Sequence, residues 1–320
     1  MTGGELAMAC LLDAAVGDPR WFPHPVRGMG AIVNWYDRRI HRLLLSFANQ
    51  RIAGMLLAVA LPSGAYAAGA LFIWLGNSID PLWGTATTVL LAWTTLAARD
   101  LIDHVLAVQR ALKSVSLAEA RTAVSKIVGR DTEEMDESDI VRATVETIAE
   151  STADGIVAPL FYLIIGGAPL ALAYKAVSTL DSIIGHLDDR YRWFGWASAR
   201  LDDVMNFIPA RITALLLAFS AGIVFRSWSV MQRTWQIVLR DGGQHPSPNS
   251  GRPEAAMAGA LGVQLGGVNS YGGLPIERPC LGDPDQPLTR NHIGRALTLM
   301  IWTSLIGVLL GLGWLFMVKG

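Results

Sequence analysis

Acidic residues recur at four-residue intervals near the middle of the chain, at Glu146, Glu150 and Asp154. In a helix this spacing places the three carboxylates on one face, with Arg142 one step earlier, where it can pair with Glu146. The carboxylates repel one another by about a few tenths of a kcal/mol per pair unless a cation lies among them. Mg²⁺ prefers such oxygen ligands and completes its shell with water and substrate phosphate. The spacing therefore predicts a magnesium site, and the alternative is a solvated acidic helix face.

A segment rich in glycine, proline and serine points to anion binding. Residues 241–254 read DGGQHPSPNSGRPE and precede an expected helix of small residues. Asn249 or Ser250 can cap that helix, and its first backbone N–H groups, beginning near Gly251, favour an anion. Arg252 adds a guanidinium fork for a phosphate or a carboxylate. We predict that this loop binds phosphate; the alternative is a plain glycine-rich connection.

The segment GGVNSYGG at 266–273 follows the same helix and adds polar groups. Its glycines allow a ligand to approach the backbone closely. Asn269 and Tyr271 are therefore predicted to contact the substrate. The region contains neither GxxxxGK[ST] nor GxGxxG, so no standard nucleotide motif is present.

A proline-rich segment, GDPRWFPHPVR at 17–27, is predicted to form a stiff loop, because its three prolines fix φ. It would hold Asp18, His24 and Arg27 in a defined relation, with Arg27 binding the substrate or its phosphate. The alternative is an elbow packed at the membrane interface. His24 and His245 are both candidate general bases, since imidazole titrates near neutral pH, and the sequence leaves the choice between them open.

Lys175 is a third catalytic candidate. It lies in an otherwise apolar stretch, where an ionisable side chain is costly and is by default functional. An ammonium group there can hold a phosphate or a carboxylate.

The elements that must position these groups are mostly apolar. Of the 320 residues 52% are hydrophobic and 17% are charged, the mean hydropathy is +0.36 and the net charge is −1. A soluble domain carries about 25% charged residues, so a bilayer is expected to be part of the solvent. The balanced charge excludes the basic surface of a nucleic-acid binder. Two cysteines, Cys10 and Cys280, are too few for a disulfide framework.

Five stretches approach the roughly 20 apolar residues that cross a hydrocarbon core as a helix. They are 52–75, 81–98, 155–174, 208–225 and 296–318. Gly166-Gly167-Ala168-Pro169 interrupts the third, which is a candidate re-entrant segment, and the fourth is weak because Arg211 lies near its start. The chain is therefore predicted to be an all-α, polytopic integral membrane protein, a single domain over 1–320. Its basic loops predict that the polar loops and short helices forming the site lie on the cytoplasmic side.

Four blocks in fixed order resemble a known family. They are GDPRWFPHPVR, ETIAESTADGIVAPLFY, KAVSTLDSIIGH and SPNSGRPEAAMAGALGVQLGGVNSYGG. From about residue 10 to the last apolar stretch the chain is similar to the CobD/CbiB family of cobalamin biosynthesis. The resemblance implies an inner-membrane adenosylcobinamide-phosphate synthase, a ligase that joins adenosylcobyric acid to aminopropanol phosphate, or a related amino alcohol phosphate, through an amide. ATP would be split to ADP and phosphate.

The partners that this resemblance implies are the corrinoid substrate, the amino alcohol phosphate, the lipid bilayer and other membrane enzymes of the late cobalamin pathway, with no nucleic acid. The chemistry fits the predicted residues, because an acyl phosphate formed with ATP and Mg²⁺ is the usual way to activate a carboxylate. The acidic face would hold Mg²⁺. Arg252 and the loop around it would hold the nucleotide phosphates. Lys175 would hold the phosphate of the amine or the corrin carboxylate.

Two other classes of protein are weighed against the synthase. A non-catalytic membrane regulator of the AmpE type would not need all four polar clusters. A transporter would use broken helices and intramembrane charges, which the glycine-proline interruption and Lys175 can mimic. ATP-dependent product formation in proteoliposomes without substrate flux would distinguish the synthase from both.

Overall fold

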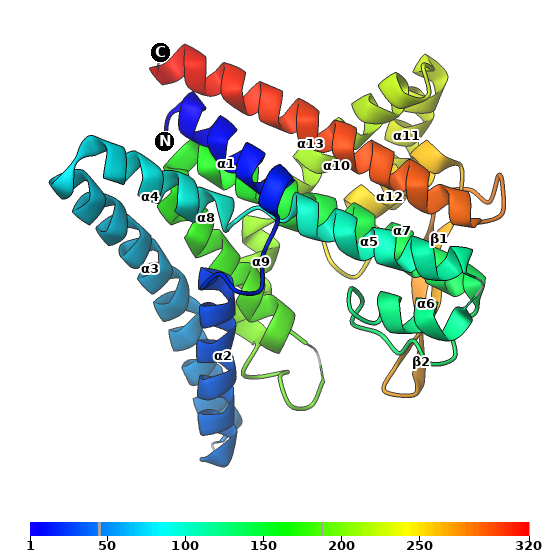
Figure 1. Ribbon diagram of the computed structural model, residues 1–320. Coiled ribbons are helices and arrows are strands. Elements are labelled where there is room, and N and C mark those ends of the chain that lie inside the picture. The colour runs from blue at the N-terminus through cyan, green and yellow to red at the C-terminus, as the bar shows by residue number, and fades with distance from the viewer. Residues whose placement is uncertain (44–45, 115, 187, 320) are drawn as a thin grey trace. The chain divides into compact units, whose positions relative to one another are not determined.

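The computed structural model describes residues 1–43, 46–114, 116–186 and 188–319, and Figure 1 shows a chain built almost entirely of helices. The prediction of an all-α membrane protein is confirmed, with one two-stranded hairpin added. The chain divides into two compact units. Unit 1 contains Met1–Ala97, Ala158–Asn206 and Leu310–Gly320, and unit 2 contains Ala98–Val157 and Phe207–Leu309.

The described residues of unit 1 form helical segments joined by short loops. They are α1 (Gly3–Val16), α2 (Pro25–Arg42), α3 (Phe47–Ile79), α4 (Pro81–Trp93), α8 (Ala158–Ile184), α9 (Trp196–Met205) and the end of α13 (Arg290–Lys319). Local signals set their starts: Thr2 and Glu5 form a capping box on α1, and the Asp80 carboxylate accepts the N–H of Leu82 at the start of α4. The core of unit 1 joins α2, α3 and α8 through buried side chains such as Leu57 and Leu180.

Four helical runs among the described residues are long and apolar enough to cross a membrane, judged by length and composition. They are Phe47–Ile79, Glu137–Ile184, Phe207–Val224 and Arg290–Val318. Little of α3 and α13 is buried within the protein, as expected of surfaces that face lipid. The predicted stretch 81–98 is different, because α4 has 13 residues and ends at Trp93. At about 1.5 Å per residue this helix is too short for a core of about 30 Å.

The run Glu137–Ile184 carries the interruption that its sequence predicts. It consists of α7 (Glu137–Ser151), a π-helical turn η1 (Thr152–Val157) and α8. Gly167 has φ 71° and ψ −169°, so α8 is kinked at the glycine-proline motif. The π-helical turn was not predicted, and it alters the spacing of side chains beyond Thr152. Whether the segment re-enters one face of the bilayer stays a prediction.

Unit 2 contains the other helices and the hairpin. They are α5 (Ala98–Lys113), α6 (Leu117–Val124), α7, η1, α10 (Phe207–Val224), α11 (Trp228–Asp241), α12 (Gly251–Leu261), β1 (Leu265–Tyr271), β2 (Leu274–Leu281) and the first part of α13. Ile237 of α11, Ala255 of α12 and Leu281 of β2 share a small core. The strands are antiparallel with Tyr271 opposite Leu274, which leaves a two-residue Gly272-Gly273 turn in which both residues have positive φ.

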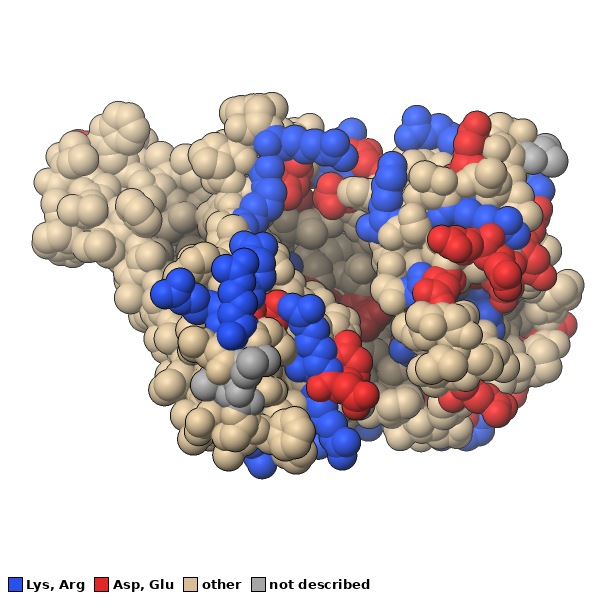
Figure 2. All heavy atoms as spheres, turned by 90° about the horizontal axis from the view of Figure 1, so that it is seen from below, with Lys and Arg blue, Asp and Glu red and all other residues tan. Residues whose placement is uncertain are grey.

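The end of the α3–α4 hairpin carries almost no charge, as Figure 2 shows at the left. Asp80 is the only charged residue between Arg51 and Arg99 in the sequence. An uncharged hairpin of this kind fits a lipid environment.

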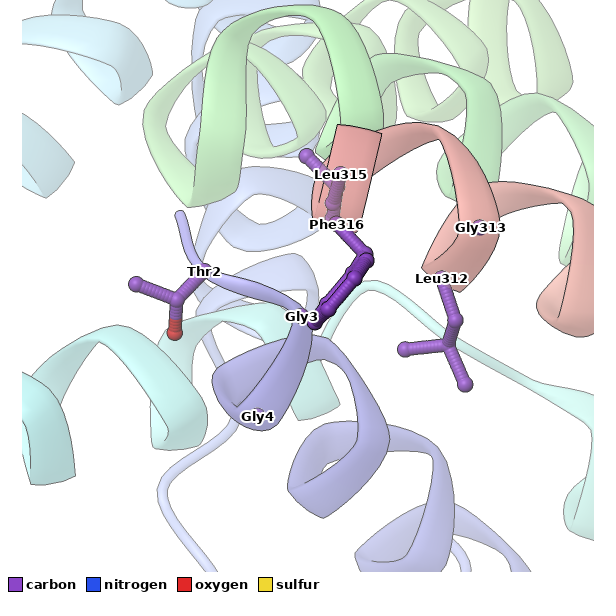
Figure 3. Close-up of a pocket in the computed structure, with 7 residues that line it drawn as sticks. All are labelled: Thr2, Gly3, Gly4, Leu312, Gly313, Leu315 and Phe316. Carbon is purple, nitrogen blue, oxygen red and sulfur yellow. The ribbon is translucent and has the colours of Figure 1, made fainter. Parts of the chain in front are cut away.

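A hollow of about 530 Å³ lies within unit 1, between the start of α1 and the end of α13 (Figure 3). Its lining consists of Thr2, Gly3, Gly4, Leu312, Gly313, Leu315 and Phe316. No ionisable side chain is present in this lining, so the hollow suits an apolar occupant. It does not provide the groups that the predicted chemistry requires.

Candidate active site

Glu146 is the centre of a buried polar network in unit 2. Its side chain projects from α7, is 9% exposed and forms an ion pair with Arg130 through one carboxylate oxygen. The other oxygen accepts a hydrogen bond of 2.8 Å from the backbone N–H of Gly266 in β1. Arg130 also donates to Oδ1 of Asn269. Because a buried charge requires pairing and hydrogen bonds, the network ties α7, the loop before it and β1 together.

Arg142 does not take the partner predicted for it. Its guanidinium pairs with Asp139, 2.9 Å away in the preceding turn of α7, and not with Glu146. It also donates to the carbonyl oxygens of Gly266 and Val268. The predicted pairing is wrong because Arg130, from outside the helix, occupies the Glu146 carboxylate. Arg142 therefore holds the backbone of β1 against α7.

Gly266 lies where a side chain does not fit. Its φ is 85°, and a Cβ atom there would lie 2.2 Å from the carbonyl oxygen of Pro279. Gly266→Ala is expected to move the N–H away from Glu146 and to destabilise the protein by about 1–3 kcal/mol, through backbone strain and overpacking. Thermal unfolding in detergent measures the effect. Gly243→Ala is the matched control, because a Cβ atom at Gly243 meets no heavy atom within 4 Å; equal unfolding temperatures for the two variants would contradict this role of Gly266.

Glu150 faces the loop that precedes α12. Its side chain is exposed, and Oε1 accepts a hydrogen bond of 3.1 Å from Oγ of Ser250. Ser250 is the N-cap residue of α12, but its side chain makes no capping bond. The backbone N–H groups of Asn249 and Ser250 both donate to Oγ of Ser247, at 3.3 Å. The structure thus brings part of the predicted acidic face and the predicted phosphate loop together.

Arg252 lies partly buried in the first turn of α12. Its Nε makes no hydrogen bond within the described chain, and its backbone N–H donates to the carbonyl oxygen of Asn249 at 3.1 Å. A guanidinium in this position can donate hydrogen bonds to an incoming oxyanion. Phosphate binding by Asn249, Ser250, Gly251 and Arg252 stays a prediction.

Glu254 belongs to the same cluster, although its position in the sequence gave no sign of this. It lies one turn into α12 and is 5% exposed. Burial raises the pKa of this carboxyl well above its usual range, and the charges of Glu146 and Glu150 raise it further, whereas Arg278 and Arg130 lower it. The carboxyl is therefore expected to keep its proton to a higher pH than an ordinary glutamate does.

Glu254→Gln is expected to stabilise the protein, relative to wild type, increasingly as pH rises above about 4.3, the ordinary glutamate pKa. Since the pKa of Glu254 is higher in the folded than in the unfolded state, its carboxyl favours folding below the unfolded pKa and loses this contribution as pH rises toward the folded pKa. Glutamine keeps the shape and does not titrate, so the stability difference should grow by up to about 1.4 kcal/mol per pH unit. Thermal unfolding across this range measures it.

The control for this experiment is Glu277→Gln, on an exposed position of β2. Its unfolding temperature should stay close to that of wild type at each pH. A pH-independent difference between Glu254→Gln and wild type would contradict a buried, protonated carboxyl.

His245 lies between two hydrogen-bond donors. The backbone N–H of Ser247 donates to Nδ1 at 3.0 Å, and Nη1 of Arg278 lies 3.3 Å from Nε2. Burial, followed by the charge of Arg278, lowers the pKa of His245, which keeps the imidazole neutral at physiological pH. A neutral, partly buried imidazole meets the first requirement for a general base. The catalytic role of His245 stays a prediction.

The acidic face does not form the predicted three-ligand metal site. Among residues 1–43, 46–114, 116–186 and 188–319 no group of three or more His, Cys, Asp or Glu side chains is placed to hold a metal ion. Arg130 and Gly266 use both oxygens of Glu146. Asp154 lies in η1, where the π-helical turn alters the four-residue spacing. The exposed Glu150 and the neighbouring Glu254 suit Mg²⁺ only if water and substrate phosphate supply the other ligands.

Three predicted residues, His24, Arg27 and Lys175, belong to unit 1. The proline-rich loop is tightly bonded, because Arg27 donates to three of its backbone carbonyl oxygens and lies 3.4 Å from the Asp18 carboxylate. Nε2 of His24 lies 3.7 Å from the same carboxylate. Lys175 is partly buried on α8. The catalytic and binding roles of these three residues stay predictions.

Three residues of the cluster in unit 2 were missed by sequence spacing: Arg130, Glu254 and Arg278. Arg130 and Arg278 lie outside the helices that carry the predicted residues, so the periodic pattern of those helices does not include them. Glu254 resembles an ordinary first-turn acid that favours the helix dipole. The available signal for Arg278 was the Gly272-Gly273 pair, which predicts a hairpin and hence places 278 opposite 267.

A chain with long apolar helices and a partly buried cluster of carboxylates, guanidiniums and an imidazole is typical of a membrane enzyme that acts on a charged substrate. Residues 6–300 match the family described as CobD/Cbib protein. The cobalamin biosynthesis protein CobD of Geobacter metallireducens is 48% identical over 311 residues, covering 96% of this chain and 95% of the relative. CobD of Pelobacter propionicus is 43% identical over 315 residues, covering 98% and 96%.

The cobalamin biosynthesis protein CbiB of Salmonella typhimurium is 42% identical over 298 residues, covering 93% of this chain and 92% of the relative. No solved structure matches the chain significantly. The chain therefore belongs to the CobD/CbiB family, and its role lies in cobalamin biosynthesis.

Proposed function

We propose that the protein is an ATP-dependent ligase that forms an amide between adenosylcobyric acid and aminopropanol phosphate, or a related amino alcohol phosphate. The product is adenosylcobinamide phosphate. The observation that carries this proposal is the cluster in unit 2, where the exposed Glu150 lies beside the phosphate-loop residue Ser250 and near the buried Glu254. Carboxylates next to the Arg252 guanidinium, whose Nε makes no hydrogen bond within the described chain, suit a nucleotide phosphate chain that arrives with a cation.

The reaction requires activation of a carboxylate. A carboxylate oxygen of the corrinoid attacks the terminal phosphorus of ATP, and ADP leaves. The amine nitrogen then attacks the acyl carbon, phosphate leaves with the original carboxylate oxygen, and the nitrogen gives up a proton. His24 and His245 are our candidates for the base that takes this proton; at His245 the N–H of Ser247 would first have to leave Nδ1, whose lone pair it occupies.

Magnesium fits this cluster in a limited way. Glu150 and Glu254 would hold the ion, with substrate phosphate and water as the remaining ligands, and the ion would neutralise charge on the transferred phosphoryl group. Arg252 and the backbone of residues 249–251 would bind nucleotide phosphates. His24, Arg27 and Lys175 remain candidates for contacts with the corrinoid or the amine.

We further propose that the protein resides in the inner membrane with this cluster on the cytoplasmic side. The support is the distribution of basic residues: seven lie between residues 99 and 154. Such loops stay on the cytoplasmic side of bacterial membranes.

An assay of the purified protein tests the reaction and the amine donor together. Adenosylcobyric acid, aminopropanol phosphate and Mg-ATP are incubated with the protein, and the products are identified by mass spectrometry. We expect a condensation product that requires every component, with ADP and phosphate formed in equal amounts. Reconstituted vesicles should form this product without carrying either substrate across the bilayer. Flux without product would favour a transporter, and neither product nor flux would favour a regulator.

A further inference from the structure

Arg278 is a partly buried cation without an ion-pair partner among the described residues. It projects from β2, and no carboxylate in the described chain forms an ion pair with it. Its two recorded side-chain contacts are with His245 and with Tyr271, whose hydroxyl accepts the N–H of Nη2 at 2.6 Å. A buried guanidinium without a negative partner is costly, and such sites are normally completed by an anion.

In the contact between Arg278 and His245, both facing groups are hydrogen-bond donors. A neutral imidazole has one N–H and one lone pair, and the backbone N–H of Ser247 uses the lone pair of Nδ1. Nε2 then carries the proton and faces the guanidinium, which can only donate, from 3.3 Å. Neither group satisfies the other. An oxyanion placed beside both would accept from Nε2 and from the Arg278 fork.

No carboxylate of the described chain takes up the Arg278 guanidinium. Glu146 is paired with Arg130. Glu254 forms neither a hydrogen bond nor an ion pair with Arg278 among the described residues, whose side-chain hydrogen bonds with Arg278 come from His245 and Tyr271. The hydroxyl of Tyr271 accepts from Arg278 and keeps its own hydrogen for a further acceptor. Three donors from β1, β2 and the loop before α12 are thus available to one ligand.

We propose that Arg278, His245 and Tyr271 form a binding site for the phosphate group of a substrate. Phosphate has enough acceptor oxygens to take hydrogen bonds from all three side chains, and arginine forks match its geometry. The assignment to a substrate rests on the proposed function, in which both ATP and the amine carry phosphate. Arg278 itself is not among the residues that sequence spacing predicted.

Equilibrium dialysis with radiolabelled inorganic phosphate tests the site without any turnover. We expect purified wild-type protein to bind phosphate and Arg278→Gln to bind it at least about tenfold more weakly, because a charge-assisted fork is lost. Arg278→Lys, which keeps the charge and loses the fork, should fall between the two. Arg110→Gln is the matched control, since Arg110 is an exposed arginine of α5 in the same unit.

The proposal is overturned if wild-type protein does not bind phosphate, or if Arg278→Gln binds it as tightly as wild type. If Arg278→Gln does not fold, phosphate binding by Tyr271→Phe tests the site instead. This variant removes one hydroxyl donor and keeps the aromatic ring. Weaker phosphate binding by Tyr271→Phe supports the site, and unchanged binding overturns it.

Competition identifies the source of the phosphate. Displacement of labelled phosphate by aminopropanol phosphate assigns the site to the amine substrate, and displacement by a non-hydrolysable ATP analogue assigns it to the nucleotide. If neither competes while phosphate binding still depends on Arg278, the anion site stands and the proposed reaction fails.

Discussion

Glu150→Gln is expected to leave the protein folded and inserted in the membrane while lowering the rate of amide formation by at least about tenfold. Glutamine keeps the size of the side chain and its contact with Ser250, but it removes the one exposed carboxylate of the cluster. A neutral amide is a poor ligand for Mg²⁺, so the magnesium concentration that gives half-maximal rate should rise. Steady-state kinetics over a magnesium titration measures both effects.

The control for this variant is Glu277→Gln, which removes an exposed carboxylate of β2 in the same unit. If Glu150 acts as a metal ligand, Glu277→Gln should retain most of the activity and an almost unchanged magnesium dependence. Wild-type rates in Glu150→Gln would remove Glu150 from the proposed metal site.

Glu146→Ala is expected to lower the free energy of unfolding by about 3–5 kcal/mol, because it leaves the buried Arg130 guanidinium without its partner. The variant also loses the acceptor for the Gly266 N–H, so the hairpin loses an anchor on α7. Thermal and denaturant unfolding in detergent measure the loss.

A double-mutant cycle with Arg130→Ala separates the ion pair from the other contacts of Glu146. The two single losses should add to more than the loss in the double variant, because each single variant leaves one buried charge unpaired. Strict additivity would mean that the pair is not coupled and that the buried network does not hold unit 2 together.

The long helices could be predicted from the sequence because their cause is local. A run without charges between Arg51 and Asp80 permits few structures in lipid other than a helix, and α3 covers the predicted stretch 52–75 with extra turns at both ends. The same reasoning makes the next predicted stretch, 81–98, longer than the helix that the structure shows. Length and hydropathy continue to residue 98, but α4 ends at Trp93, and the last predicted residues belong to a turn and to the start of α5.

The polar cluster was predictable only in part, because its contacts join segments that are distant in the sequence. Glu150 and the loop at 249–252 were singled out from local patterns, and the structure brings them together. The pairing of Glu146 was assigned to Arg142 because only neighbours in the helix are visible in a periodic pattern; the real partner, Arg130, comes from the preceding loop. The hairpin was missed because glycine at 266 and 267 weakens the pattern of a strand.

The fate of oxygen in the corrinoid carboxylate tests the central claim, ATP-driven acyl transfer by this chain, most directly. Adenosylcobyric acid labelled with oxygen-18 in the reacting carboxylate is converted by the purified protein, and the released phosphate is analysed by mass spectrometry. We predict one labelled oxygen in each phosphate released with the amide product. Amide formation that leaves the phosphate unlabelled would contradict the claim.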